Sequence, residues 1–323
     1  MRVHRGLHAS PGLPCAVTIG NFDGIHLGHQ ALLRRLKQEA HTRGLSTSVI
    51  TFEPHPKEFF TPQAAPVRLT SLREKLELFR SMGIDTVYVY PFRANLASQS
   101  ATEFVEKQLL AQIQTRYLLI GDDFCFGAKR LGNFALLSQY ADQGVFELDA
   151  MHTVAWENLR VSSTNIRLAL EKGELETAAQ MLDRPYRVSG KVVHGNKLGR
   201  TIGFPTANIQ IKHNRPPLSG IFAVSVDGIA DRPLAGAASF GVRPTVMNNG
   251  LPTLEVFLLD YSGDLYGTHV GVRFHKKLRQ EEKYPDLDTL IAQIHKDVDQ
   301  VRTFFNEHPH LLTADASPLL KTY

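Results

Sequence analysis

An apolar run, a glycine-rich turn and an amphipathic segment follow one another in residues 15–41, CAVTIGNFDGIHLGHQALLRRLKQEAH. The β-branched and apolar residues 15–19 predict a buried strand, and the apolar spacing over 29–41 predicts a helix. A strand that turns directly into a helix is the first half of a strand-helix-strand unit. This order predicts a parallel sheet that binds ligands at the carboxyl ends of its strands.

The same alternation continues through the first half of the chain. Further strands are expected at 47–52, 86–90, 117–120 and 145–148, and further helices at 71–81 and 100–110. Ser71 with Glu74, and Ser100 with Glu103, have the spacing of capping boxes, which predicts where these two helices begin. Residues 1–183 are therefore predicted to form an α/β domain with a doubly wound parallel sheet.

The pattern changes after residue 183. Strand-like runs punctuated by Gly and Pro follow, and no helix interrupts them: 187–193, 221–226, 234–240, 253–259 and 269–274. Such a series is typical of an antiparallel sandwich or barrel, and we expect a small β-barrel over 184–307. A C-terminal helix that begins at Asp286 or Asp288 carries an apolar stripe and is expected to pack on the barrel. Residues 308–323 have no periodicity and are expected to form a tail.

The composition is that of a soluble globular protein, with 43% hydrophobic and 21% charged residues in a chain of 323. No apolar run approaches the roughly 18 residues of a membrane span. Pro11, Gly12 and Pro14 interrupt the N-terminal segment before a signal-peptide core, so a cytoplasmic protein is expected. Cys15 and Cys125 are the only cysteines, which excludes a disulfide framework and a cysteine-based zinc site.

The excess positive charge of +4 lies entirely in the second part of the chain. Residues 1–183 carry 19 basic and 19 acidic side chains, whereas 184–323 carry 17 basic and 13 acidic ones. This excess is too small for tracking a polynucleotide backbone, but it suits a small phosphorylated ligand. We therefore expect small-molecule substrates, no nucleic-acid or membrane partner, and a monomer or weak homo-oligomer.

The glycine-rich turn after the first strand is the first candidate site. Four residues of the turn are candidate nucleotide contacts: Gly20, Asn21, Phe22 and Asp23. His26 and His29, three residues apart at the helix entrance, place two imidazoles on one face, toward charge developing on a phosphate chain. Free N–H groups at the same helix start attract phosphate. The alternative is a glycine-rich turn whose two polar residues cap the helix.

Two further segments end near the same predicted crevice. His55 follows the second strand, where it either contacts a ligand or belongs to a stiff, proline-bounded loop. Asp122, Asp123 and Phe124 follow the strand at 117–120. Two carboxylates and an aromatic ring suit a ribose hydroxyl and a flat ring, although an Asp-rich turn has the same composition.

A fourth segment combines hydroxyl groups with a cation. Ser162, Ser163 and Thr164 stand at a predicted helix start, with Arg167 one turn further on. Hydroxyls and free amides at a helix start, next to a guanidinium, can clamp a triphosphate. The same residues also make an ordinary helix N-cap, and the sequence leaves both interpretations open.

The second half contains the run GNKLGRTIGFPTAN, residues 195–208. Its flexible part supplies candidate ATP contacts: Gly195, Lys197, Leu198, Gly199 and Gly203. Thr206 and Asn208 offer two uncharged oxygens for a Mg²⁺ ion shared with ATP phosphates, because Mg²⁺ keeps few protein ligands in such sites. The alternative is a Pro-Thr turn in which Asn208 satisfies the backbone.

A glutamate in the strand at 253–259 is the last candidate. Alternation places Leu254 and Val256 on one face and Glu255 on the other. A lone strand glutamate is most simply a solvated side chain. The basic run around Arg279 is likewise most simply a solvated face.

Taken together, these motifs resemble the bacterial bifunctional riboflavin kinase/FAD synthetase family. The matching stretches cover nearly the whole chain: 18–29, 51–56, 121–127, 161–167, 190–208, 241–245 and 264–284. The resemblance implies an N-terminal adenylyltransferase domain of nucleotidyltransferase fold, followed by a riboflavin kinase domain built on a small β-barrel. It also implies Mg²⁺ as cofactor, with ATP, riboflavin and FMN as substrates.

The resemblance assigns roles to individual residues. His26 and His29 would stabilise the transition state of adenylyl transfer, and Ser162, Ser163, Thr164 and Arg167 would bind ATP phosphates. In the second domain, the implied roles are Thr206 and Asn208 as ligands of ATP-bound Mg²⁺, Glu255 as the base, and Arg279 near the flavin. Two departures from the family are Cys125, where a basic residue is frequent, and Ser239-Phe240-Gly241, where Asn/Ser-Ile-Gly is usual.

Two rival functions remain open at this point. One is a single-step adenylyltransferase whose barrel binds flavin without catalysis. The other is a class I aminoacyl-tRNA synthetase, to which the His26–His29 motif would belong. The chain lacks a Lys-Met-Ser-Lys-Ser-like loop, and its uncharged N-terminal half is poorly suited to tRNA.

Overall fold

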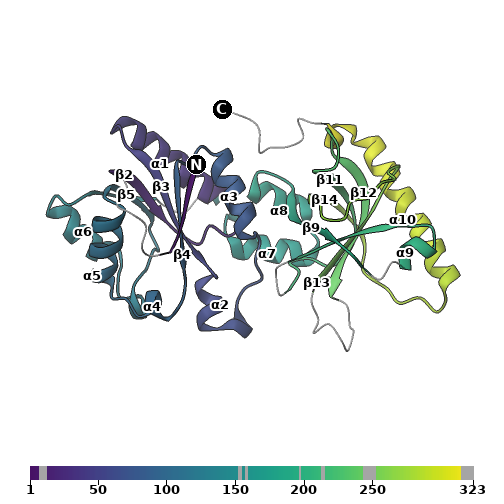
Figure 1. Ribbon diagram of the computed structural model, residues 1–323, viewed down its shortest axis with the longest axis horizontal. Coiled ribbons are helices and arrows are strands. Elements are labelled where there is room, and N and C mark those ends of the chain that lie inside the picture. Colours follow the sequence, from purple (N-terminus) through teal and green to yellow (C-terminus); the bar gives the residue numbers. More distant parts are fainter. Residues whose placement is uncertain are drawn as a thin grey trace. The chain divides into compact units, whose positions relative to one another are not determined.

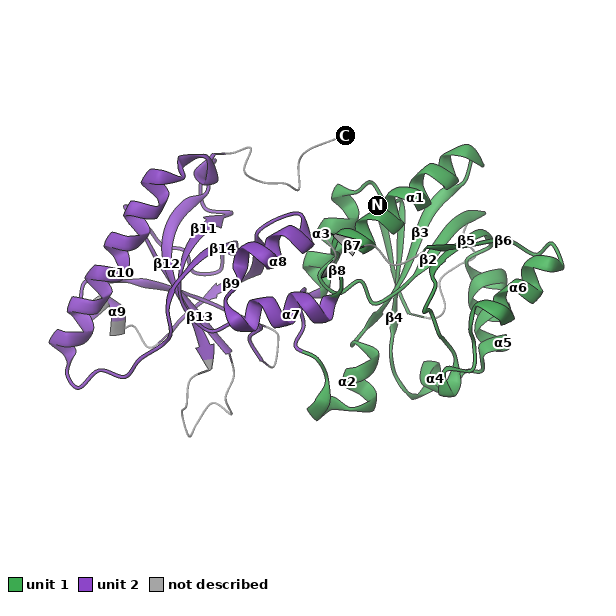
Figure 2. Cartoon of the chain, turned by 180° about the vertical axis from the view of Figure 1, so that it is seen from behind, with its two compact units in different colours: residues 1–66, 72–162 green, residues 67–71, 163–323 purple. Residues whose placement is uncertain are grey.

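The computed structural model describes residues 1–6, 13–151, 155–156, 159–195, 198–211, 215–242 and 252–313 (Figure 1). Two compact units divide the chain, one of residues 1–66 and 72–162 and the other of 67–71 and 163–323 (Figure 2). The division after Ser162 lies before the boundary expected at residue 183, which stays a prediction. None of the helices in the described residues is long and apolar enough to span a membrane.

The first unit contains a six-stranded parallel sheet. Its strands lie in the order β1 (Arg2–Arg5), β4 (Thr86–Pro91), β3 (Ser46–Glu53), β2 (Cys15–Ile19), β5 (Thr115–Gly121) and β6 (Glu147–Met151). The chain runs outward from β2 through β3 to β4 and then returns to the other side of β2 at β5. The doubly wound parallel sheet is therefore confirmed, with its switch point between β2 and β5.

Helices cover both faces of this sheet (Figure 1). They are α1 (Leu27–Thr42), α2 (Pro56–Phe60), η1 (Pro62–Ala64), α3 (Leu72–Ser81), α4 (Ala94–Ala97), α5 (Ala101–Glu103), η2 (Phe104–Gln112), η3 (Ala128–Arg130) and α6 (Phe134–Asp142). A two-stranded ribbon, β7 (Ala155–Trp156) with β8 (Leu159–Arg160), completes the unit. The capping box of Ser100 and Glu103 is present at α5.

The core of the first unit follows from strand alternation. Val17 and Ile19 of β2 point to the face covered by η2 and α6, where they join a cluster with Phe104 and Leu137. The opposite face is packed by α1, whose stripe includes the fully buried Leu33. Both faces of a parallel sheet are thus removed from water, which is the usual condition for its stability.

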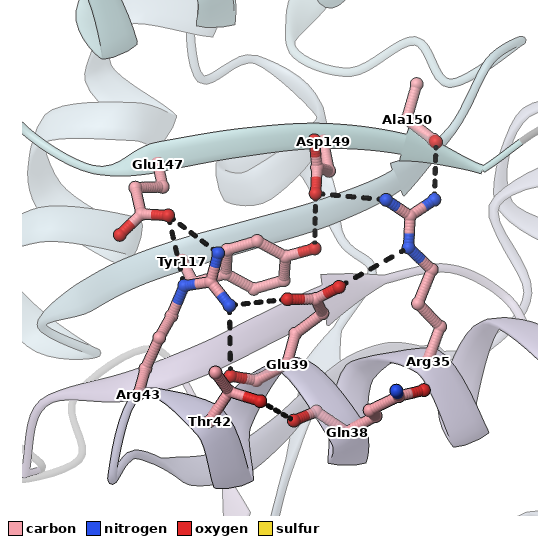
Figure 3. A network of polar contacts seen from close by, with 9 residues as sticks. All are labelled: Arg35, Gln38, Glu39, Thr42, Arg43, Tyr117, Glu147, Asp149 and Ala150. Atoms are coloured by element: carbon pink, nitrogen blue, oxygen red, sulfur yellow. Dashed lines mark hydrogen bonds and ion pairs between the residues drawn. The ribbon is translucent and has the colours of Figure 1, made fainter.

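A polar network fixes α1 to the edge of the sheet (Figure 3). The Arg43 guanidinium lies 4.3 Å from the centre of the Tyr117 ring and pairs with Glu147 at 2.7 Å. The Tyr117 hydroxyl donates to Asp149 at 2.8 Å, and Arg35 pairs with the same carboxylate at 3.0 Å. Burial, followed by the hydrogen bond to Asp149, raises the pKa of Tyr117. This network holds the helix whose other end carries His26 and His29.

The second unit begins with α7 (Ser163–Lys172) and α8 (Leu175–Leu182) and continues into a closed barrel of six antiparallel strands. The barrel order is β10 (Thr206–Ile209), β13 (Pro252–Leu258), β12 (Leu234–Val242), β11 (Gly220–Asp227), β14 (His269–Arg279) and β9 (Tyr186–Val193). Short α9 (Leu198–Thr201), long α10 (Leu287–Glu307) and η4 (Pro309–Leu312) complete it. The predicted β-barrel with a C-terminal helix is confirmed.

Three elements of the chain differ from the sequence expectations. β10 is not among the strands expected from the sequence, but it pairs with β13 on one side and β9 on the other and thereby closes the barrel. β1 is exposed and polar, and only its pairing with β4 makes it a strand. α9 interrupts the strand series after β9. Asp286, rather than Asp288, caps α10, accepting a hydrogen bond from the Thr289 N–H at 2.8 Å.

Candidate active sites

A cavity of about 990 Å³ opens in the first unit where β2, β3, β5 and β6 end. It is lined by most of the predicted nucleotide contacts: Gly20, Asn21, Phe22, His26, His29, His55, Asp122, Asp123, Phe124 and Ser162. Asp23 is buried and is not among the lining residues. The carboxyl ends of parallel strands thus bring together segments that are far apart in sequence.

The turn after β2 is held in an unusual conformation. Phe22 and Ile25 have positive φ angles of 49° and 40°, although neither is glycine, and both side chains are fully buried. A non-glycine residue in this conformation destabilises the fold by on the order of 1–3 kcal/mol, so the conformation is found only where the surrounding structure holds it in place. The Asn21 carbonyl accepts hydrogen bonds from the Thr51 hydroxyl and the Lys75 ammonium, both at 3.3 Å. Neither the positive φ angles nor the hydrogen bonds to the Asn21 carbonyl could be predicted from the sequence.

His26 is both a helix cap and a cavity residue. Its Nδ1 accepts a hydrogen bond from the His29 backbone N–H at 3.3 Å, as the N-cap of α1. An imidazole whose Nδ1 accepts carries its proton on Nε2 when the ring is neutral. The two histidine rings stack with centroids 3.7 Å apart and planes 16° from parallel. The interpretation of His26 as a helix cap is therefore correct. The capping hydrogen bond orients the imidazole and does not exclude a second role for it.

His29 is kept neutral at ordinary pH. Burial lowers its pKa well below the usual value, and the neighbouring His26 and Lys75 lower it further. Its Nδ1 is buried without a hydrogen-bond partner among the described residues, as is the Oδ1 of Asn21. Buried polar atoms are almost always paired in native proteins. Two unpaired atoms in residues that line one cavity indicate that a bound ligand completes the site.

The remaining wall combines aromatic rings with cations. Including Phe22, seven phenylalanines line the cavity, and the other six are Phe52, Phe60, Phe92, Phe104, Phe124 and Phe126. Phe124 and Phe126 stack with centroids 5.4 Å apart, which suits a flat ligand ring. Four basic side chains also line it, and the sequence reasoning missed all of them: Lys57, Lys129, Arg130 and Arg160. Cys125 lines the same wall, and its thiol lies 3.7 Å from the Asp123 carbonyl.

The predicted phosphate clamp is divided between the two units. Ser162 lines the cavity, whereas Ser163 and Thr164 open α7 of the second unit. Arg167 of the same helix donates a hydrogen bond to the Val67 carbonyl. The ATP contacts predicted for Ser163, Thr164 and Arg167 therefore stay predictions.

The second candidate site is a row of side chains on the outer face of the barrel. Successive register pairs join Asn208 to Glu255, Glu255 to Ser239, Ser239 to Ile221, and Ile221 to Arg279. Directly opposed residues in antiparallel strands share a face, and the neighbours of Glu255 on β13 are buried inside the barrel. We call these five residues the polar row. It contains the predicted Mg²⁺ ligand Asn208, the predicted base Glu255 and Arg279.

Oxygen-bearing side chains gather at one end of the polar row. The Thr206 hydroxyl donates to the half-buried Glu255 carboxylate at 3.3 Å, and Asn208 stands opposite Glu255. A Cβ on Gly195 would lie 2.3–2.4 Å from the Asn208 side chain, so only glycine lets the amide lie there. Uncharged oxygens beside a carboxylate fit Mg²⁺, which takes oxygen ligands and shares phosphate oxygens with ATP. The described residues contain no group of three His, Cys, Asp or Glu suited to a metal.

The loop before β10 is tightly turned. A Cβ on Gly199 would lie 2.3 Å from the Phe204 carbonyl, and Gly203 has a positive φ of 85°. Leu198 opens α9, and Lys197 lies outside the described residues. The backbone of this loop thus explains why glycine occupies positions 199 and 203. The contacts of these two residues to ATP stay predictions.

Arg279 lies at the other end of the polar row, in an ion pair. Its Nη2 lies 2.7 Å from the buried Asp297 of α10, and this hydrogen bond raises the pKa of Arg279. Nη1 donates to the Gln280 carbonyl at 3.0 Å, and the guanidinium lies 5.7 Å from the Tyr284 ring centre. These contacts hold the guanidinium in place, and its position near the flavin stays a prediction.

Comparison with known proteins identifies the family to which each part of the chain is similar. The FAD synthetase family model matches residues 10–165, and the riboflavin kinase model matches 182–305. A bifunctional riboflavin kinase/FMN adenylyltransferase of Pseudomonas fluorescens is 43% identical over 96% of this chain and 100% of its own. The chain belongs to the bifunctional riboflavin kinase/FMN adenylyltransferase family. The cavity lies within the FAD synthetase match and the polar row within the riboflavin kinase match.

Other relatives extend the family likeness. A protein of the same name from Haemophilus influenzae is 44% identical over 95% of this chain and 100% of its own. A solved structure from Streptococcus pneumoniae, titled a macrolide-efflux protein, is 28% identical with a TM-score of 0.79 and covers 94% of this chain and 99% of that one. These likenesses cover 94–96% of this chain.

Proposed function

We propose that the protein makes FAD from riboflavin in two ATP-dependent steps, each performed by one unit. The second unit phosphorylates riboflavin to FMN with release of ADP. The first unit transfers an adenylyl group from another ATP to FMN, with release of pyrophosphate. The observation that supports this division is that the polar row with Glu255 lies in the riboflavin kinase match, whereas the stacked pair His26 and His29 lies in the FAD synthetase match.

In the kinase step, the nucleophile is an alcohol and must lose a proton. Glu255 accepts the proton of the ribityl 5′-hydroxyl while that oxygen attacks the γ-phosphorus of ATP and the bond to the ADP oxygen breaks. The Thr206 hydroxyl, which donates to the Glu255 carboxylate, orients it. Thr206 and Asn208 would hold Mg²⁺ together with the ATP phosphates, and the bound ion supplies positive charge to the phosphate chain.

In the adenylyl step, the nucleophile is the FMN phosphate, which is already ionised at neutral pH. Its oxygen attacks the α-phosphorus of ATP, and the bond to pyrophosphate breaks. No general base is needed, so the protein contributes position and charge stabilisation. His26 and neutral His29 donate hydrogen bonds to the phosphate oxygens, and the first N–H groups of α1 add the positive end of the helix dipole.

Incubation of the purified protein with riboflavin, ATP and Mg²⁺, followed by chromatography of the flavins, tests this function. FMN and then FAD are the expected products. If FAD forms only from supplied FMN, the protein is a single-step adenylyltransferase with a non-catalytic barrel. If no flavin changes but an amino acid stimulates ATP–pyrophosphate exchange, the synthetase alternative is correct.

Four further points belong to the same proposal. The kinase step depends on Mg²⁺, and the protein is a monomer or weak homo-oligomer in the cytoplasm that binds no nucleic acid. The oxygen donors on β10 support the first point, and the balanced charge of residues 1–183 supports the last. Omission of Mg²⁺, size-exclusion chromatography and salt-dependent nucleic-acid binding assays test these points.

A further inference from the structure

The polar row contains a hydroxyl for which the sequence predicted no role. Ser239 of β12 stands directly opposite Glu255 and shares its face of the barrel. The Ser239 hydroxyl donates a hydrogen bond to Glu281 Oε1 at 2.8 Å. Glu281 follows the end of β14 by two residues, so a second carboxylate reaches the row from outside the strands that form it.

The position of Glu281 is built into the neighbouring strand. A Cβ on Gly241 would lie 2.2 Å from Glu281 Oε2 and 2.8 Å from Oε1. Gly241 does not have a positive φ, so its backbone conformation does not require glycine. Because residue 241 has no side chain, the Glu281 carboxylate can pack against β12.

The hydrogen bond from Ser239 decides what this face of the site can recognise. A serine hydroxyl has one hydrogen, and Ser239 gives it to Glu281. Toward any other group, Ser239 then offers only lone pairs, and the carboxylates of Glu255 and Glu281 also only accept. Opposed residues in an antiparallel pair have Cβ atoms about 4.5–5.5 Å apart, so one short chain can contact all three. Three adjacent acceptors select a ligand that carries several O–H donors.

We propose that Ser239 and Glu281 form a polyol subsite that binds the ribityl hydroxyls of riboflavin and aligns the terminal hydroxyl with Glu255. The subsite rests on the proposed kinase role of Glu255. Glu281 fixes the Ser239 hydrogen, Gly241 makes room for Glu281, and the acceptors hold the sugar-alcohol chain rather than the flavin ring. The kinase thereby recognises the part of riboflavin that it phosphorylates.

Steady-state kinetics of FMN formation by the full-length protein test the subsite. The variants are Ser239→Ala, Glu281→Ala and Gly241→Ala, of which the last displaces the carboxylate without removing it. Glu282→Ala is the matched control, because Glu282 is also an exposed carboxylate of this segment but contacts Tyr284. Lumiflavin, which has the flavin ring without the ribityl chain, serves as a competitive inhibitor that reports ring binding alone.

Each of the three variants is expected to raise the riboflavin KM about tenfold, the effect of losing one hydrogen bond to a charged group. The inhibition constant of lumiflavin, the KM for ATP and FAD formation from supplied FMN are expected to change less than about twofold, as in Glu282→Ala. An unchanged riboflavin KM in the variants would overturn the subsite, and so would an equal rise in the lumiflavin constant. An inactive Glu255→Gln protein together with an unchanged riboflavin KM in these variants would retain the kinase mechanism and reject only the subsite.

Discussion

The two proposed sites of this protein hold their proposed reactive groups in opposite ways. In the first unit, the histidine pair lines a cavity walled by aromatic rings, and burial keeps His29 neutral. In the second unit, half-buried Glu255 stands on an outer barrel face among hydroxyl and amide groups. The difference follows from the nucleophiles. A phosphate needs only orientation and charge stabilisation, whereas an alcohol needs an acceptor for its proton.

Replacement of the proposed base is expected to have the largest effect. Glu255→Gln keeps the shape and most hydrogen bonding of the side chain but removes the proton acceptor, so FMN formation should fall about 10²- to 10⁴-fold. The KM for ATP should change little, because Thr206 and Asn208 remain. Riboflavin-dependent ADP release measures the rate, and a thermal melt checks the fold.

The control for this variant is FAD formation from supplied FMN, which should be unaffected. An unchanged rate of FMN formation in a folded variant would remove Glu255 from the mechanism. It would also remove the chemical contrast between the two sites.

Loss of one histidine is expected to affect the other reaction only. His29→Ala removes a proposed transition-state donor, so FAD formation should fall about 10²- to 10³-fold. FMN formation should stay within about twofold of the wild type, because the polar row lies in the other unit. Pyrophosphate release with FMN as substrate measures the loss. A parallel loss of FMN formation in a folded protein would contradict the separation of the sites.

A glycine variant tests the proposed Mg²⁺ ligand Asn208 without removing any oxygen. In Gly195→Ala, the new Cβ would overlap the Asn208 side chain, which must rotate away from its place opposite Glu255. The KM for ATP in the kinase step should rise about tenfold, equivalent to one lost charge-assisted contact. ATP titrations of FMN formation at fixed Mg²⁺ measure it. An ATP dependence equal to that of the wild type would argue against Asn208 as a ligand.

The smallest effect on catalysis is expected at a histidine outside both sites, where the prediction concerns folding stability. His275 of β14 has its Nε2 2.8 Å from the Ser225 hydroxyl and packs against Phe304 and Phe305 of α10. Burial, and to a smaller extent three neighbouring basic groups, together lower the pKa of His275 to about 4; the three groups are Arg273, His308 and His310. The unfolded chain, with an ordinary histidine pKa near 6.5, therefore binds this proton first as the pH falls.

The barrel should accordingly lose about 2 kcal/mol of stability between pH 7 and pH 5 from His275 alone. The contribution is fully present above about pH 6.5 and is lost as the pH falls toward 4. In His275→Gln, the amide keeps a partner for Ser225 but does not titrate, so the difference between pH 7 and pH 5 should shrink by that amount. Urea unfolding at the two pH values measures it, and an equal difference in both proteins would show that His275 does not titrate as described.

The parts of the fold that depend on local pattern were predictable from the sequence. The strand at 15–19 has the expected bounds, because its buried β-branched residues leave no alternative, and alternation placed Glu255 outside the barrel. β10 was not predictable, because its four residues, which follow a proline, are too few to show the alternation of polar and apolar side chains that indicates a strand. They form a strand only because β9 and β13 offer hydrogen bonds on both sides.

The same limit applies to the sites. Motif spacing identified His26 and His29, and the strand ends brought His55 and Asp122 to the same cavity. The positive φ of Phe22, the cations from η3 and the contact of Glu281 with Ser239 depend on tertiary structure. A sequence shows which residue types are present near a site, but backbone strain and cross-strand neighbours appear only in the folded chain.

Complementation between two inactive variants tests the central claim most directly. Glu255→Gln should make no FAD from riboflavin, and His29→Ala should stop at FMN. An equimolar mixture of the two proteins with riboflavin, ATP and Mg²⁺ should form FAD again, because the FMN released by one protein is the substrate of the other. A mixture that forms no FAD, under conditions where the wild type does, would contradict two independent active sites in one chain.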